Sequence, residues 1–206
     1  MYFLMMNVAY KPFDNKLVRQ AVNHSVDPSA IVKNIFDGIG YPIDGPVGPH
    51  VIGSDPKLKR YPYDPNKAKA LLAQAGYSDG CDVQLYYSAG RYAKDREVCQ
   101  AVAAQMVKGG FRVELISQEW ALFWGQEGVN GGKLPFYYNN RGSLTDADTF
   151  YDQYFRTGTT KRCNYSNPSF DKIIDEEQMI PDIKKRIALL QQAGKILLED
   201  APFLPL

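Results

Sequence analysis

The chain has 206 residues, of which 45% are hydrophobic and 23% are charged, the composition of an ordinary globular protein with a sizeable core. Its 24 basic and 23 acidic side chains leave a formal net charge of +1, which argues against a surface built as a whole for nucleic acid or an anionic membrane. Three cysteines without a CxxC spacing argue against a disulfide framework and a structural zinc site.

The first third of the chain predicts a strand, two helices and a long loop. Residues 2–9 favour an extended strand, and this apolar run is too short to span a bilayer and has no basic leader or cleavage site. We expect Asp14 to cap the first helix, and Asp27 followed by Pro28 to start the second. The density of proline and glycine in residues 39–62 excludes a long helix, and a connection of this length is typical of a functional or packed loop.

The rest of the chain alternates between helical and extended patterns. Asp64, Pro65 and Gly76 delimit a short helix with a narrow apolar stripe. The segments that follow are a strand at 82–88, a helix at 92–110, a strand at 111–117, a short helix at 119–126, a strand at 134–140, and helices at 146–155, 167–178 and 182–199. A strand, a helix and a strand with short connections predict a parallel pair within an α/β fold. We expect Ile183 to belong to the buried face of the last helix.

The sequence shows no catalytic signature. Its two histidines, His24 and His50, are isolated, and no GxSxG or HExxH motif accompanies them. The acidic residues Asp146, Asp148 and Asp152 resemble part of a calcium loop, but the central glycine and the terminal glutamate are missing. Capping of a helix is the favoured interpretation of this acidic segment.

One cluster of residue types suits a ligand cleft. Trp120 and Trp124 lie one helical turn apart, and the next strand supplies Tyr137 and Tyr138 followed by the polar run 139–141. Aromatic walls with amide and guanidinium groups would suit an elongated polar ligand, and the arginine in this run could pair with a carboxylate. The alternative, that the aromatic residues simply pack the core, stays open on these residues alone.

The order of motifs along the chain resembles a known family. The phrases are KPFDNKLVRQAVNHSVDPSAIVKNIFDGIG, YPYDPNKAKALLAQAGYSDG, GRYAKDREVCQAVAAQM, QEW and YSNPSFDKIIDEEQ…LLEDAPFLPL. In this order they resemble the family 5 extracytoplasmic solute-binding proteins, the oligopeptide, dipeptide and nickel-type receptors of ABC transporters. The resemblance implies an α/β fold, the C-terminal lobe of a periplasmic-binding-protein-like architecture (type II, cluster C), with a mixed sheet flanked by helices.

The resemblance also implies a domain organisation and a function. Residues 1–9 would be a strand crossing from an N-terminal lobe that this chain lacks, and residues 10–206 would be a truncated C-terminal ligand-binding lobe. The implied function is non-enzymatic: capture of a peptide or peptide-like solute between two lobes and delivery to an ABC permease in the membrane. We expect a monomer outside the cytoplasm, periplasmic or lipid-anchored on the outer face of the cell membrane, with no cofactor, no metal and no nucleic acid, and with its export signal absent from this chain.

The resemblance assigns ligand contacts residue by residue. Trp120 matches a tryptophan that lines the cleft of peptide-binding relatives. The segment 138–143 matches the one that carries an aspartate for a peptide's amino terminus, but Ser143 or Leu144 stands at that position here. The expected ligand-binding residues are Trp120, Tyr138, Asn140, Arg141 and Ser143.

This departure from the family pattern puts a free-amine peptide in doubt and favours a ligand with a carboxylate or many hydroxyl groups. Two alternatives stay open. The chain could be a stand-alone protein-interaction module. It could also belong to a receptor for a non-peptide solute such as an oligosaccharide or an opine-like acid.

Overall fold

The computed structural model describes residues 1–159 and 161–206. The strands are β1 (Tyr2–Met6), β2 (Cys81–Tyr87), β3 (Phe111–Ser117), β4 (Phe136–Asn140) and β5 (Phe203–Pro205). The helices are α1 (Lys16–Ser25), α2 (Pro28–Ile35), α3 (Pro65–Gln74), α4 (Asp95–Lys108), α5 (Trp120–Trp124), α6 (Ala147–Phe155), α7 (Pro168–Gln178) and α8 (Ile183–Asp200). Within these described residues, none of the helices has both the length and the apolar character needed to cross a membrane.

The five strands form one mixed sheet in the order β3-β2-β4-β1-β5. Strand β1 runs antiparallel to both β4 and β5, whereas β2 runs parallel to β3 and β4. The β2–α4–β3 unit confirms the predicted parallel pair. Strand β5 has only three residues, one of them proline, so it is too short to show a periodic pattern in the sequence.

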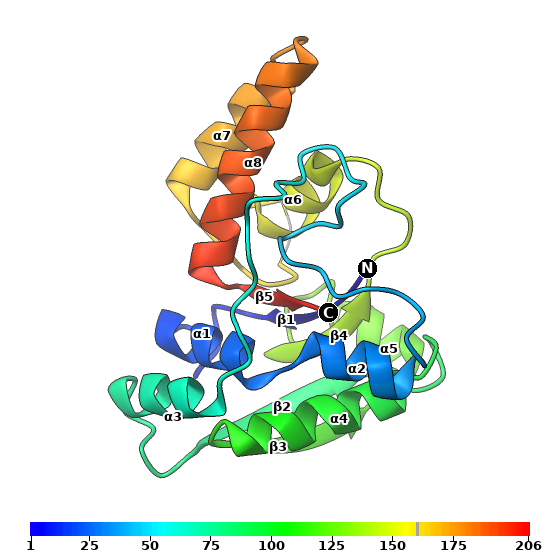
Figure 1. Ribbon diagram of the computed structural model, residues 1–206, viewed down its shortest axis with the longest axis vertical. Coiled ribbons are helices and arrows are strands. Elements are labelled where there is room, and N and C mark those ends of the chain that lie inside the picture. The colour runs from blue at the N-terminus through cyan, green and yellow to red at the C-terminus, as the bar shows by residue number, and fades with distance from the viewer. Residues whose placement is uncertain (160) are drawn as a thin grey trace.

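The two faces of β1 enter two different hydrophobic clusters, because successive side chains of a strand point to opposite faces. Leu4 and Met6 belong to one cluster, and Phe3 and Met5 to the other. All four side chains are 0% exposed. Figure 1 shows α1, α2 and α4 on one side of the sheet and α6, α7 and α8 on the other, which confirms a mixed sheet flanked by helices.

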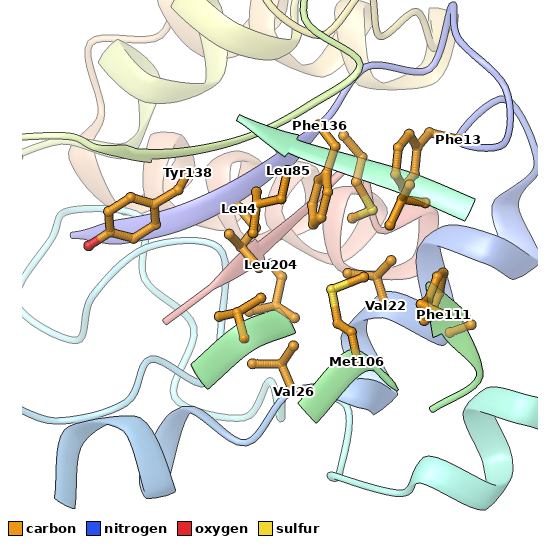
Figure 2. Packing of buried hydrophobic residues seen from close by; sticks show 14 of the residues in the cluster. Leu4, Phe13, Val22, Val26, Leu85, Met106, Phe111, Phe136, Tyr138 and Leu204 are labelled. Carbon is orange, nitrogen blue, oxygen red and sulfur yellow. The ribbon is translucent and has the colours of Figure 1, made fainter. Parts of the chain in front are cut away.

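The first cluster lies between the sheet and helices α1 to α4. Figure 2 shows Leu4, Phe136 and Tyr138 from the sheet together with Val22 from α1 and Met106 from α4. Half of the buried residues of the second cluster are aromatic. The ring of Phe3 lies edge-on to those of Phe150 and Tyr154 of α6, with centroids 5.5 and 5.7 Å away. Such pairs add to the stabilisation that burial of the rings supplies.

The predicted helix boundaries are mostly confirmed. The carboxylates of Asp27 and Asp64 accept backbone N–H groups at the starts of α2 and α3. The prediction for Asp14 is wrong: the side chain of Asn15 accepts the N–H of Leu17 at 2.9 Å and caps α1, because the preceding turn continues through Asp14.

The prediction that Ile183 is buried is also wrong. Ile183 is 50% exposed, and nearby Met179 is 82% exposed. Both residues lie where α7 and α8 meet, at the end of a helical hairpin that projects beyond the sheet (Figure 1). The tip of such a hairpin has no neighbouring layer to cover its apolar side chains.

The long loop 39–62 is irregular but packed, as predicted. Ile52 exchanges backbone hydrogen bonds with residues 145 and 147 at the start of α6, and Ile43 and Val47 are buried. Gly53 has a φ of +90°, and a Cβ there would lie 2.7 Å from Cβ of Leu190 in α8. The loop is therefore held against α6 and α8 by a close approach that needs glycine.

The position of Phe3 predicts a large effect of its truncation. Phe3→Ala should lower the free energy of unfolding by about 3 to 5 kcal/mol, because it leaves a cavity among aromatic rings that cannot close around it. Chemical denaturation monitored by circular dichroism measures this, with Met179→Ala as the exposed control, for which a change within about 0.5 kcal/mol is expected. A loss below about 1 kcal/mol for Phe3→Ala would contradict the central place of β1.

Candidate functional site

A hollow of about 520 Å³ lies at the end of β4. Asn140, Arg141 and Ser143 line it from the end of β4 and the segment that follows. Tyr41 and His50 line it from the long loop 39–62. Three of the five ligand residues expected from the sequence are therefore brought together at one place.

A second hollow, of about 500 Å³, lies beside Phe13 and the ends of β2 and β3. The Arg112 guanidinium there pairs with the Asp82 carboxylate at 2.6 Å, and Glu114 accepts a hydrogen bond from Gln84 at 2.8 Å. Three of the four charged side chains that line this hollow therefore already have partners within the fold. We therefore take the hollow at the end of β4 as the candidate site.

The backbone of the site is fixed by the pairing of β4 with β1. In this register Tyr2 lies opposite Asn140, and the N–H of Arg141 donates to the carbonyl of Met1 at 2.8 Å. The N–H of Asn140 also donates to Oδ1 of Asn139 at 2.8 Å. These backbone hydrogen bonds fix Asn140 and Arg141 at the end of a central strand. Their side chains therefore project from defined positions.

The guanidinium of Arg141 lacks a counter-charge. Its Nε is buried and has no hydrogen-bond partner in residues 1–159 and 161–206, and no ion pair involves Arg141 there. No aspartate or glutamate is among the described residues that line the hollow. A buried donor left without a partner costs about 1 to 3 kcal/mol. The hollow therefore offers an unused donor and a positive charge.

Trp120 lies next to the site but does not line the hollow. Its ring stacks on that of Trp124 with centroids 5.4 Å apart, and the guanidinium of Arg91 lies 4.4 Å from its centroid. Tyr92 lies edge-on to Trp120 at 6.2 Å and edge-on to Tyr2 at the same distance. Since Tyr2 lines the hollow, a continuous row of aromatic rings connects Trp120 with it.

Tyr92 joins this aromatic row to the polar end of β4. Its hydroxyl donates to Oδ1 of Asn139 at 2.7 Å, and burial raises the pKa of the phenol, which keeps the donor proton in place. Sequence reasoning did not single out Tyr41, Arg91 or Tyr92. Their only signal is residue type, because contacts across the fold bring them to the site.

The expectation that Tyr138 contacts ligand is corrected by its burial. Tyr138 is 1% exposed, does not line the hollow and stacks on Tyr2 with centroids 5.8 Å apart. Figure 2 shows it at one end of the first cluster. Tyr138 points to the face of the sheet that α1 to α4 cover, so the core interpretation holds for this residue.

The acidic segment after the site forms a charged cluster with α7 and α8. Asp146 caps α6 and accepts from the Arg186 guanidinium at 2.5 and 3.1 Å, which confirms its capping role. Nε of Arg186 also lies 2.7 Å from the carboxylate of Glu177, which is 0% exposed. Burial, and next the carboxyl group of Asp148, raise the pKa of Glu177 to about 8. One guanidinium thus serves several carboxyl groups and anchors the end of the site segment.

Comparison with known proteins identifies relatives along the whole chain. Residues 1–162 match the family model described as bacterial extracellular solute-binding proteins, family 5 Middle. The heme-binding protein A of Haemophilus influenzae is 28% identical over 98% of this chain and 38% of its own length. The glutathione-binding protein GsiB of Pectobacterium atrosepticum is 30% identical over 98% of this chain and 41% of its own length.

A solved structure is similar over the entire chain. The periplasmic binding protein DppA from Helicobacter pylori, associated with an ABC transporter and in complex with the peptide STSA, superposes with a TM-score of 0.89 at 26% identity. The match covers 100% of this chain and 40% of that one. The present chain thus spans well under half the length of these relatives.

The charged cluster predicts a pH dependence of stability. Between pH 4.5, the ordinary pKa of a glutamate, and pH 8, folded Glu177 keeps a proton that the unfolded chain has released. The free energy of unfolding should therefore fall as the pH rises from 5 to 8, by roughly 2 to 4 kcal/mol from this residue. Glu177→Gln should remove this fall, measured by urea denaturation at several pH values.

The exposed neighbour Glu176 supplies the control for this measurement. Glu176→Gln should retain the pH dependence of the parent chain. An unchanged slope in Glu177→Gln would show that Glu177 is ionised in the folded protein and would contradict the assignment.

Proposed function

The chain belongs to the bacterial extracellular solute-binding proteins of family 5, and from this premise we propose that it forms the ligand-binding lobe of an ABC-importer receptor. The receptor captures a peptide or a peptide-like solute between two lobes and delivers it to a membrane permease. The family consists of solute-binding proteins. The proposal therefore assigns this chain a binding function and no chemical reaction.

The observation that carries the proposal is the open hollow at the end of β4. It is polar on one side, and no acidic side chain from the described ranges lines it. Relatives of which this chain covers 38% and 41% have enough further residues to close such a hollow from the opposite side. One of these relatives is a glutathione-binding protein, and the solved relative holds a peptide, which supports a peptide-like solute.

Four of the expected residues keep a proposed ligand role. Asn140, Arg141 and Ser143 line the hollow and supply polar groups, and Trp120 supplies an aromatic face beside it. Tyr138 is left out because it is buried in the first cluster.

Closure of two lobes explains how such a receptor reports that it is loaded. A ligand that contacts both lobes binds the closed form more tightly than the open form and so shifts the population toward closure. A permease that docks the closed form then distinguishes loaded from empty receptor. Family members are extracytoplasmic, and we propose the same place for this protein, as a monomer.

The proposal predicts stabilisation of the full-length protein by its solute. A ligand at 100 times its Kd should raise the free energy of unfolding by about 2.7 kcal/mol, because it binds only the folded form. A thermal-shift screen of dipeptides, oligopeptides, opine-like acids and oligosaccharides measures this as a higher Tm. No response to any of these solutes, together with a stable protein partner in pull-down experiments, would favour the interaction module instead.

The position of Trp120 in the aromatic row predicts that its truncation affects ligand binding more than stability. Trp120→Ala in the full-length protein should weaken binding of the solute found by the screen at least about tenfold, equivalent to 1.4 kcal/mol. Its effect on the free energy of unfolding should be smaller than that, since the ring is only half-buried. Titration calorimetry and denaturation measure the two quantities.

Trp124→Ala is the matched control, since it removes the same side chain one turn along α5, where the ring stacks on Trp120 and makes no ring contact with Tyr92 within the described structure. We expect this variant to bind the solute more tightly than Trp120→Ala does. A large loss of stability with unchanged binding in Trp120→Ala would assign Trp120 to the core.

A further inference from the structure

We propose that the hollow at the end of β4 binds a carboxylate group of the solute and that Arg141 is its principal donor. This inference deepens the proposed function and rests on it for the kind of solute. It assigns the polarity of the site: the end of the ligand that enters this hollow is anionic.

The charges around the hollow support this polarity. Arg141 and His50 are the basic side chains in its lining, and the described lining includes no aspartate or glutamate side chain. Two acidic residues close in sequence to the lining residues already form ion pairs. Asp146 pairs with Arg186, and Asp44 pairs with Lys59. An amine entering the hollow would therefore meet positive charge without a counter-ion, whereas an anion would meet an unpaired guanidinium.

The geometry of Arg141 suits a carboxylate. Arg141 directly follows the last residue of β4, and its backbone N–H donates to the carbonyl of Met1, so the side chain starts from a fixed backbone position. Its Nε is buried and has no partner in the described chain. A carboxylate accepts two parallel hydrogen bonds from Nε and one terminal nitrogen of a guanidinium, which would satisfy this donor.

The neighbouring polar groups can complete the coordination. Ser143 brings a hydroxyl donor and Asn140 an amide donor to the same lining. Tyr41 and His50 face the hollow from the long loop, with their rings edge-on at 6.5 Å. Among its side chains the hollow thus offers one fixed cation and several neutral donors, which fits a singly charged carboxylate better than a doubly charged phosphate.

A matched pair of probes tests this assignment in the full-length protein. Tri-alanine carries a free carboxylate and tri-alanine amide does not, while the rest of the two molecules is the same. We expect calorimetry to give at least tenfold tighter binding of the free acid. This preference should disappear in Arg141→Gln, be partly retained in Arg141→Lys, and remain intact in Arg96→Gln, which changes an exposed arginine of α4.

The unfolding midpoint of Arg141→Gln shows whether a loss of binding comes from misfolding. We expect it to match that of the parent protein, because Arg141 has no ion pair to lose in the described structure. If the variant is destabilised, Arg141→Lys, which keeps the charge without the planar fork, replaces it in the comparison.

Succinate and inorganic phosphate serve as additional probes that do not depend on a peptide ligand. Stabilisation by succinate in the parent protein but not in Arg141→Gln supports the carboxylate site, even if neither tripeptide binds and the peptide function fails. Equal binding of both tripeptides overturns the carboxylate site and leaves the proposed function intact. A response to phosphate alone, or to none of the four probes, also overturns it.

Discussion

The antiparallel pairing of β1 with β4 is the interaction on which the rest of the structure depends. Strand β1 lies between β4 and β5 and sends Leu4 and Met6 into one cluster and Phe3 and Met5 into the other. A shift of one residue in the pairing register of β1 would exchange these two sets of side chains. Phe3 and Met5 would then face α1 to α4 instead of the aromatic cluster. The two layers of helices therefore fix the register, and the register fixes where β4 ends.

The candidate ligand site is formed by the residues at the end of β4. Beyond the last paired residue, Asn140, the chain leaves the sheet and its polar side chains turn to the hollow. On the far side of this segment, the cluster of Asp146, Glu177 and Arg186 anchors the start of α6 to the α7–α8 hairpin. The segment between these two anchors carries Arg141 and Ser143. A site fixed at both ends can distinguish the polarity of a solute without reorganising, which reduces the entropy lost on binding.

Local sequence patterns predicted most of the fold but only part of the site. The caps at Asp27 and Asp64, and the parallel pair around α4, follow from signals within a few residues. The pairing of residue 2 with residue 140 and the strand β5 depend on contacts across most of the chain, which no local pattern carries. For the same reason the residue types near 138–143 indicated a polar site, yet burial of Tyr138 became evident only once the faces of β4 were known.

The most direct test of the central claim is a structure of the full-length protein with its bound solute. The account predicts that the solute lies between two lobes, with an anionic group against the guanidinium of Arg141 and with further contacts from Asn140 or Ser143. It predicts that β1 and β4 keep the register in which Tyr2 faces Asn140. A solute bound elsewhere, with residues 140–143 still open to solvent in the closed protein, would contradict it.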